Sequence, residues 1–388
     1  MICSRGRRDE QGERSPAREE RAGVSITRVA ASAFGRGKTS GRMADYASFH
    51  LFAGLRVLAN RWADVTVTLT TPPLLGLWGS LGARLGGPKH VTFLMDHHPD
   101  AEFELGMIDR ASFAGRSAEG LYRWTLRNAS HNVSLGPYQD ERVARRDVPA
   151  HRRAVIPIWS SADEIVPVPH AQNVLRRDLG WEGRFVVLYS GNAGLVHSFD
   201  ELLETVRLLQ QRSPDVLFAF VGGGPRMPEV QEAVRREELT NAVFLPSFQR
   251  GQLSQLLSAA DMHFVSLRPQ HVGVSVPGKL YGQLASARPI AFVGPSDCET
   301  ADDLRSARAG VVLPVGAGKR LAREIECLRE DPERCERMGQ RGRAWFLEHR
   351  ERERSCESWR SLLEALAAGR APQTVQEEST ADERRRAA

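Results

Sequence analysis

The chain has 388 residues, which is enough for two domains that each bury a hydrophobic core of their own. Lys and Arg (53) nearly balance Asp and Glu (48), so the formal net charge of +5 argues against a nucleic-acid partner. The five cysteines are scattered and include no C-x-x-C pair, which argues against a zinc site or disulfide framework and favours a reducing, cytoplasmic compartment. No apolar run approaches the ~20 residues that a membrane-spanning helix needs.

The two ends of the chain are rich in charge and lack an apolar periodicity. Residues 1–22, "MICSRGRRDEQGERSPAREERA", and residues 369–388 are therefore predicted to be disordered tails. The first of them also lacks the apolar core of a secretory signal.

From Val24 onward, short β-branched runs alternate with helical patterns. Strands are expected at "DVTVTL" (64–69), "HVTFLM" (90–95), "HNVSL" (131–135) and "AVIPI" (154–158). Helices are expected at 74–85 and 111–128. A second series of strands follows at 185–190, 216–224, 242–248, 262–267, 289–294 and 310–315.

Strands that alternate with helices indicate parallel sheets covered on both faces, so the fold class is α/β with two doubly wound, Rossmann-like domains. The expected order is a domain at 23–165, a proline-containing linker at 166–182, a second domain at 183–348 and a helix at 349–368. Within that helix, Cys356, Trp359, Leu363 and Leu366 recur at three- and four-residue steps and predict one apolar face.

The first candidate site is the small-residue loop in "VLYSGNAGLVHSF" (187–199). Gly191, Asn192 and Gly194 follow a strand and precede a helix that starts near Ser198. At that place backbone N–H groups could face a phosphate. The equally weighted alternative is a tight turn that needs positive φ angles.

The second candidate is "GVSVPGKLYGQLASARPI" (273–290). Pro277 suits a helix start, and Lys279 then projects near the positive end of that helix. A bound diphosphate would resolve this conflict by accepting hydrogen bonds from both the helix and the ammonium group. The alternative is a solvated lysine. A third run, "FVGGGPRM", ends at Arg226, and a purely structural turn is favoured there.

In the first half of the chain, "FLMDHHPDAEFELG" places four polar side chains after a strand: Asp96, His97, His98 and Asp100. Such a group can supply a general base or hold an acceptor. It can equally consist of a capping Asp and surface histidines. A metal site is disfavoured because no second His or Cys group with ligand spacing accompanies it.

Taken in order, these segments resemble the family-four glycosyltransferases of the GT-B fold, and within them the colanic-acid-type, polysaccharide-assembly subgroup. The resemblance runs from about Val24 to Leu366. Its motifs are "YSGNAG", "FVGGG", "SAADMHFVSL", "GVSVPGKLYGQLASARP", "IPIWSSAD" and "DPERCERMGQRGR".

The resemblance implies a retaining transfer of sugar from a nucleotide-sugar, here a UDP-sugar, to an acceptor hydroxyl. The acceptor would be a saccharide or lipid-linked saccharide of cell-surface polysaccharide or glycolipid synthesis. The donor would bind in a cleft between the two domains without a metal or other cofactor. The implied donor-binding residues are Gly191, Asn192, Gly194, Ser275, Val276, Lys279 and Glu299. Lys279 would neutralise the leaving diphosphate, Asp96 and His97 would line the acceptor side, and the last helix would return to the first domain.

The sequence departs from the family pattern at several places. Val274 and Gly282 occupy the positions of two frequent glutamates, which leaves Glu299 as a substitute for a ribose contact. Leu195 replaces a common basic residue. Only the charged segment precedes "GVSITRV", where the family usually begins with a strand, a glycine-rich loop and a helix, so the first domain is expected to be incomplete.

Two other functions stay open on these grounds. One is a non-catalytic or truncated subunit that binds nucleotide or a partner without turnover, and the other is an epimerase or hydrolase of the same fold. Peripheral membrane contact at the inner face of the membrane is also considered, through the arginines Arg116, Arg123 and Arg127 on the expected helix 111–128. An ordinary solvated helix face is the favoured interpretation of these three.

Overall fold

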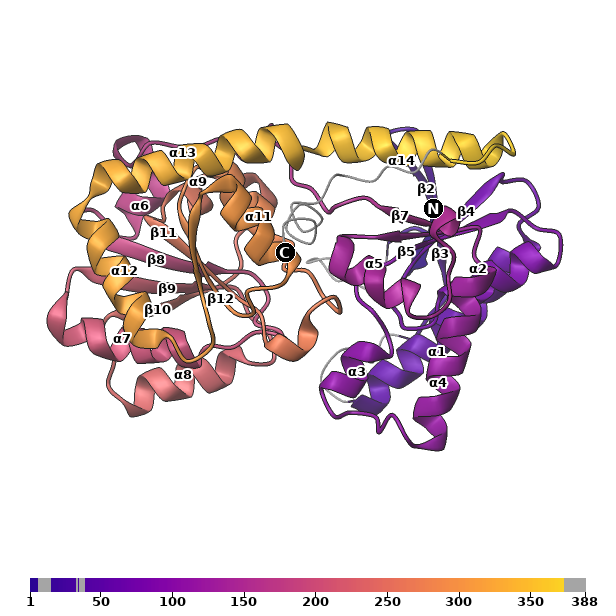
Figure 1. Ribbon diagram of the computed structural model, residues 1–388, viewed down its shortest axis with the longest axis horizontal. Helices are drawn as coiled ribbons and strands as arrows, with labels where there is room; N and C mark the ends of the chain where they lie inside the picture. Colours follow the sequence, from indigo (N-terminus) through magenta and orange to yellow (C-terminus); the bar gives the residue numbers. More distant parts are fainter. Residues whose placement is uncertain (6–14, 33, 35–38, 373–388) are drawn as a thin grey trace, which may run out of the picture. The chain divides into compact units, whose positions relative to one another are not determined.

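A computed structural model describes residues 1–5, 15–32, 34 and 39–372. The chain divides into two compact units (Figure 1). Unit 1 comprises Met1–Ser134, Val143–Ala154 and Leu362–Thr374, and unit 2 comprises Leu135–Arg142, Val155–Ser361 and Val375–Ala388. The parts of the two expected tails at 6–14 and 373–388 lie outside the described residues.

The N-terminal segment of unit 1 corrects one expectation. Instead of being disordered throughout 1–22, it contributes β1 (Ile2–Ser4) and β2 (Arg18–Arg21), which flank β3 (Val24–Val29) in a three-stranded sheet. β1 runs parallel to β3 and β2 runs antiparallel to it. The two added strands pair the backbone edges of β3, and an ion pair of 2.8 Å between Arg28 and Glu19 joins β3 to β2.

A second sheet of unit 1 has the order β4-β5-β6-β7 and contains the four strands expected in this half. Its strands are β4 (Val65–Leu69), β5 (Lys89–Phe93), β6 (His131–Ser134) and β7 (Arg153–Val155). The helices of this half of the chain are α1 (Thr39–Ala59), α2 (Gly76–Arg84), α3 (Asp100–Glu104), α4 (Phe113–Asn128) and α5 (Pro137–Ala144). The two helices expected at 74–85 and 111–128 are therefore confirmed as α2 and α4.

Unit 2 is built on one six-stranded sheet of order β10-β9-β8-β11-β12-β13, in which every neighbouring pair is parallel. The strands are β8 (Phe185–Ser190), β9 (Val216–Val221), β10 (Ala242–Leu245), β11 (Met262–Ser266), β12 (Ile290–Val293) and β13 (Gly310–Leu313). All six expected strands are confirmed.

The helices of unit 2 lie on both sides of this sheet (Figure 1). They are α6 (Val174–Asp178), α7 (Asp200–Arg212), α8 (Met227–Arg236), α9 (Leu253–Ser258), α10 (Lys279–Ala285), α11 (Glu299–Ala307), α12 (Gly318–Glu330) and α13 (Pro332–His349). The last helix, α14 (Arg352–Ala367), begins in unit 2 and belongs to unit 1 from Leu362 onward. Single 3-10 turns occur at Ala150–Arg152, His170–Gln172, Arg250–Gln252 and Pro269–His271.

The strands of unit 2 bury both of their faces, as the doubly wound pattern requires. Along β8, Val187 and Tyr189 belong to one buried cluster, whereas Val186 and Leu188 belong to another. Side chains of successive strand residues point to opposite faces, so the continuous apolar run serves two cores at once. This arrangement confirms the α/β fold class.

The apolar face of α14 is rotated from the expected one. Cys356 is exposed, whereas Ser355, Leu362 and Leu366 are buried. The steps of four and seven residues that link the buried positions still describe one helix face, displaced by about one residue. The expected face included Leu366, but it counted Cys356 as apolar because the thiol is small and neutral.

Candidate functional site

Two loops follow the neighbouring strands β8 and β11 at the carboxyl edge of the unit 2 sheet. From β8 the chain continues to β9 on one side, whereas β11 lies on the other side and continues to β12. The chain therefore adds strands outward in opposite directions from β8 and from β11. Open parallel sheets bind ligands at such a switch point in the strand order. The first sequence-predicted segment, 187–199, contains the end of β8, and the second, 273–290, follows β11.

Lys279 brings these two loops together. It is the first residue of α10, directly after Pro277 and Gly278, and its Nζ donates a hydrogen bond of 2.8 Å to the Tyr189 hydroxyl at the end of β8. The ammonium also lies 4.0 Å from the centroid of the Tyr189 ring, a cation–π distance. A Cβ built on Gly191 would lie 3.9 Å from Nζ.

Within the described part of the chain, no acid balances the charge of Lys279. Among the described residues it forms no ion pair, and its printed polar contact is with the neutral Tyr189. Burial lowers the pKa of its ammonium group to about 7. A cation held in this way favours an incoming anion, because the anion restores the charged form.

Two further basic groups lie near Lys279. The positive charges of Lys279 and Arg226 add to burial in lowering the pKa of His197, to about 3. The His197 ring is therefore neutral, and its Nδ1 carries a proton because it lies 2.6 Å from the Ser266 carbonyl oxygen, which can only accept. Sequence reasoning assigned His197 no role.

Arg226 is buried close to the first glycine loop. Its Nη1 donates to the His197 carbonyl oxygen at 3.3 Å and its Nη2 to the Glu229 carboxylate at 2.8 Å. Its Nε is buried and has no hydrogen-bond partner among the described residues. Arg226 thus places a basic group at this end of the sheet, where the sequence pattern lacked one at Leu195.

The backbone N–H groups of the first loop differ in whether they are already hydrogen-bonded. Gly191 has φ +119°, and its N–H donates to the Val221 carbonyl oxygen at 2.9 Å. Contrary to the expectation from the sequence, this N–H is therefore not available to a phosphate. The N–H of Ala193 is likewise bonded, to the Gly223 carbonyl oxygen at 2.6 Å. The N–H groups of Asn192 and Gly194 take no part in these bonds.

The glycines of the third run, 222–224, allow the turn after β9 to pack directly against the first loop. Gly222 and Gly224 both have positive φ, and a Cβ on Gly224 would approach the Ala193 nitrogen to 2.5 Å. A Cβ on Gly222 would come equally close to the Gly191 oxygen, at 2.5 Å. The favoured structural interpretation of "FVGGG" is therefore confirmed, since these glycines let two turns touch.

The remaining donor-side residues belong to two other segments of unit 2. Ser275 and Val276 belong to the segment that leads into α10, and Ser275 is buried. Glu299 begins α11, and its Oε1 accepts a hydrogen bond of 3.1 Å from the backbone N–H of Gln139 in α5. Burial raises the pKa of Glu299 to about 7. Its role at a ribose stays a prediction.

Asp96 and His97 follow β5 in unit 1. His97 is fully buried, and its Nδ1 lies 2.8 Å from the Tyr122 hydroxyl. The backbone N–H of the half-buried Asp96 donates a hydrogen bond of 3.2 Å to the Thr70 hydroxyl. Nearby, the buried Asp100 pairs with Arg146 at 2.7 Å, which favours a structural role for that carboxylate.

The three arginines considered for membrane contact are exposed on α4, but they are not equally available. Arg123 pairs with Asp147, and Arg116 donates to the Ala111 carbonyl oxygen at 2.6 Å. Membrane contact through them stays a prediction.

Within the described ranges, no helix combines the length and apolarity needed to span a bilayer. Nor do three or more His, Cys, Asp or Glu side chains group as a metal site in this part of the chain.

Comparison with known families divides the chain at nearly the same place as the fold does. Residues 1–159 match the "Glycosyl transferase 4-like domain", and residues 172–345 match "Glycosyl transferases group 1".

Among curated proteins, the probable glycosyltransferase WbjE of Pseudomonas aeruginosa is 23% identical over 266 residues, which cover 69% of this chain and 66% of that protein. The alpha-D-kanosaminyltransferase of Streptomyces kanamyceticus is 22% identical over 67% of this chain and 65% of its own length. The chain thus spans slightly less than two thirds of these two relatives.

Solved structures agree on the fold. The sucrose-phosphate synthase of Thermosynechococcus elongatus superposes with a TM-score of 0.72 at 17% identity, covering 95% of this chain and 89% of that one. Anabaena Alr3699/HepE, solved in complex with UDP and glucose, gives 0.67 at 16% identity, covering 88% and 86%. Residues 1–159 are thus similar to a glycosyl transferase 4-like domain and residues 172–345 to glycosyl transferases group 1, and the parallel-sheet α/β fold matches that of GT-B glycosyltransferase structures.

Proposed function

We propose that the chain is a retaining glycosyltransferase that moves a sugar from a nucleotide-sugar, a UDP-sugar, to an acceptor hydroxyl. The acceptor is a saccharide or lipid-linked saccharide of cell-surface polysaccharide or glycolipid synthesis, as in the colanic-acid-type subgroup. Support comes from the glycosyltransferase names of the matched relatives and from the UDP-glucose complex of HepE.

One observation carries the proposal: the ammonium of Lys279 lies at the switch point of the sheet without a carboxylate partner among the described residues. A diphosphate placed there would pair with Lys279 and receive the N–H groups of Asn192 and Gly194. Stabilising the charge on the departing nucleoside diphosphate is the catalytic contribution proposed for Lys279. No metal is needed for that contribution, since the protein supplies the cation itself.

The other assigned residues have supporting roles in this proposal. Ser275 and Val276 border the donor from the loop before α10, and Glu299 contacts the ribose. Asp96 and His97 belong to the acceptor side. The full burial of His97 suits a group that holds a hydroxyl better than one that becomes charged.

The alternative is a subunit of the same fold that binds the nucleotide without turnover. It is favoured by Val274 and Gly282, which replace two glutamates of the family pattern. Both functions require the nucleotide site, so they differ in transfer and not in binding.

Calorimetric titration of the pure full-length protein with UDP tests the shared site. We expect saturable binding that Lys279→Ala weakens about tenfold or more, because a charge-assisted contact contributes ~1.5–3 kcal/mol. Lys319→Ala, which removes an exposed lysine of the same unit, should leave the affinity unchanged. Absence of saturable UDP binding by the wild type would refute the proposal. Binding without transfer from any UDP-sugar to saccharide acceptors would establish the non-catalytic alternative.

A further inference from the structure

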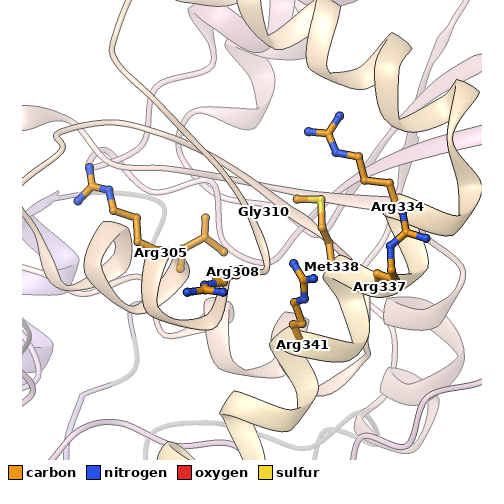
Figure 2. A pocket seen from close by; sticks show the side chains of 8 residues that line it. Arg305, Arg308, Gly310, Arg334, Arg337, Met338 and Arg341 are labelled. Carbon is orange, nitrogen blue, oxygen red and sulfur yellow. The ribbon is translucent and has the colours of Figure 1, made fainter.

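A pocket of about 380 Å³ lies wholly within unit 2, between the end of α11, the start of β13 and one side of α13. Its polar lining is made of five arginines arranged around Met338 (Figure 2). The complete lining is Leu304, Arg305, Arg308, Gly310, Arg334, Arg337, Met338 and Arg341. None of the described residues that line it is acidic or aromatic.

Three of the five arginines have acidic partners outside the pocket. Arg305 pairs with Asp302 at 3.3 Å, Arg334 with Glu324 at 3.5 Å, and Arg337 with Glu333 at 3.2 Å. Glu333 is exposed, where such a pair contributes little, whereas Asp302 and Glu324 are half-buried. Arg305 also donates to the Ser296 carbonyl oxygen at 2.7 Å.

Arg308 and Arg341 differ from these three. Both are exposed, and neither has an ion pair or side-chain hydrogen bond within the described part of the chain. Among the described residues, the pocket therefore presents two guanidinium groups without an acidic partner beside three that are paired with one carboxylate each. This excess of positive charge favours the binding of an anion in the pocket.

The three arginines of α13 crowd one side of that helix. Arg334, Arg337 and Arg341 recur at three- and four-residue steps, which places like charges next to each other along the helix. Their mutual repulsion is unfavourable unless an anion lies between them. They belong to "DPERCERMGQRGR", a motif to which the proposed sugar transfer assigns no role.

The two arginines of α11 are partly explained by the helix itself. Cations near a helix C-terminus interact favourably with the free carbonyl groups, which accounts for Arg305. Arg308, however, takes the left-handed conformation at the C-cap, with φ +49°, where glycine is usual. A side chain retained in that conformation costs about 1 kcal/mol relative to glycine, and here it lines the same pocket as Arg341.

We propose that this arginine pocket binds a small phosphate-bearing anion, separately from the nucleotide site at Lys279. Guanidinium groups match the oxygen atoms of phosphate with paired hydrogen bonds, and the pocket contains arginines without lysines. Its volume suits a small ligand, and the lack of an aromatic side chain leaves no stacking surface for a nucleobase. The chemistry fits a diphosphate or a phosphate ester, whether free or carried by a lipid headgroup.

Titration of the full-length protein with inorganic pyrophosphate at about 0.15 M salt tests the proposal, since exposed charges are screened there beyond ~8 Å. Saturating UDP is present so that the Lys279 site is filled, and the titration is repeated on Lys279→Ala without UDP. We expect one pyrophosphate per chain in both. The double variant Arg308→Gln/Arg341→Gln should lose affinity at least about tenfold, while its UDP affinity stays unchanged.

The matched control is Arg320→Gln/Arg323→Gln, which removes two exposed arginines of α12 that do not line the pocket. It should bind pyrophosphate within about twofold of wild type. A second arm uses phosphatidylcholine vesicles with and without phosphatidylglycerol. Vesicle binding that depends on Arg308 and Arg341, without pyrophosphate binding, would assign the phosphate to a lipid. Equal losses in both double variants, or no binding in either arm, would overturn the proposal.

Discussion

At the scale of single residues, the ammonium of Lys279 contacts the Tyr189 hydroxyl and ring and has no acidic partner among the described residues. Burial brings its pKa to about 7, so part of the population is neutral at neutral pH. An anion beside it stabilises the charged form and raises the pKa. Binding of a diphosphate should therefore take up a proton above pH 7.

This uptake can be measured by titrating UDP at pH 8.5 in two buffers of different ionisation enthalpy. Wild type should take up nearly one proton per bound UDP, and its affinity should fall up to about tenfold for each pH unit above 7. Lys279→Met keeps the length of the side chain without its charge and should show neither effect. The same pH slope in wild type and Lys279→Met would exclude Lys279 as the titrating group.

The sequence indicated some of these residues and missed others for a physical reason. Gly191 and Lys279 lie in small-residue loops directly after strands, which is a local pattern. Tyr189 and His197 lie in the same segment as Gly191, but only the fold brings Lys279 and Arg226, which are far away in the chain, close to them. Their spacing alone therefore carried no signal.

At the scale of elements, the turn after β8 and the turn after β9 determine each other. The Ala193 N–H donates to the Gly223 carbonyl oxygen, and the Arg226 N–H donates to the Ala193 carbonyl oxygen at 3.0 Å. Gly224 lies inside this contact with φ +130°. The position of the first glycine loop thus depends on a residue of the neighbouring turn.

Gly224→Ala should destabilise unit 2, since the new Cβ would meet backbone atoms at 2.5 Å in a conformation that is strained for alanine. We expect the free energy of unfolding to fall by about 1–3 kcal/mol and UDP affinity to fall with it. The neighbouring Gly223→Ala is the control, because nothing lies within 4 Å of its Cβ position. Urea unfolding and UDP titration check both, and equal stability of the two variants would contradict the argument.

Strands and helix faces were predicted correctly where the local sequence determines them, and missed where contacts with distant residues do. The ten strands expected from β-branched runs are present, and central ones such as β8, β9 and β11 bury their own side chains. β1 and β2 were missed because residues such as Arg18 and Arg21 are stabilised by backbone pairing with β3, not by burial. The face of α14 was displaced because burial depends on what that helix packs against.

At the scale of the whole molecule, both units bury neutral histidines. Burial lowers the pKa of His90 in unit 1 and of His263 in unit 2 to about 3. The His90 ring contacts the Ser80 hydroxyl at 2.9 Å and the Thr68 hydroxyl at 2.8 Å. An unfolded histidine binds its proton near pH 6.5, whereas these bind it only near pH 3. Stability is therefore lost progressively as the pH falls below 6.5.

Each such histidine should remove about 1.4 kcal/mol of stability per pH unit below 6.5, since the unfolded state binds the extra proton. His90→Gln keeps hydrogen-bonding groups but does not titrate, so it should lower stability at pH 7 and make its decline toward pH 5 shallower by that amount. Urea unfolding followed through hydrogen exchange of the β5 peptide isolates unit 1. His151→Gln, at an exposed position, should keep the wild-type slope. Parallel declines for wild type and His90→Gln would show that His90 is protonated as readily in the folded state as in the unfolded one.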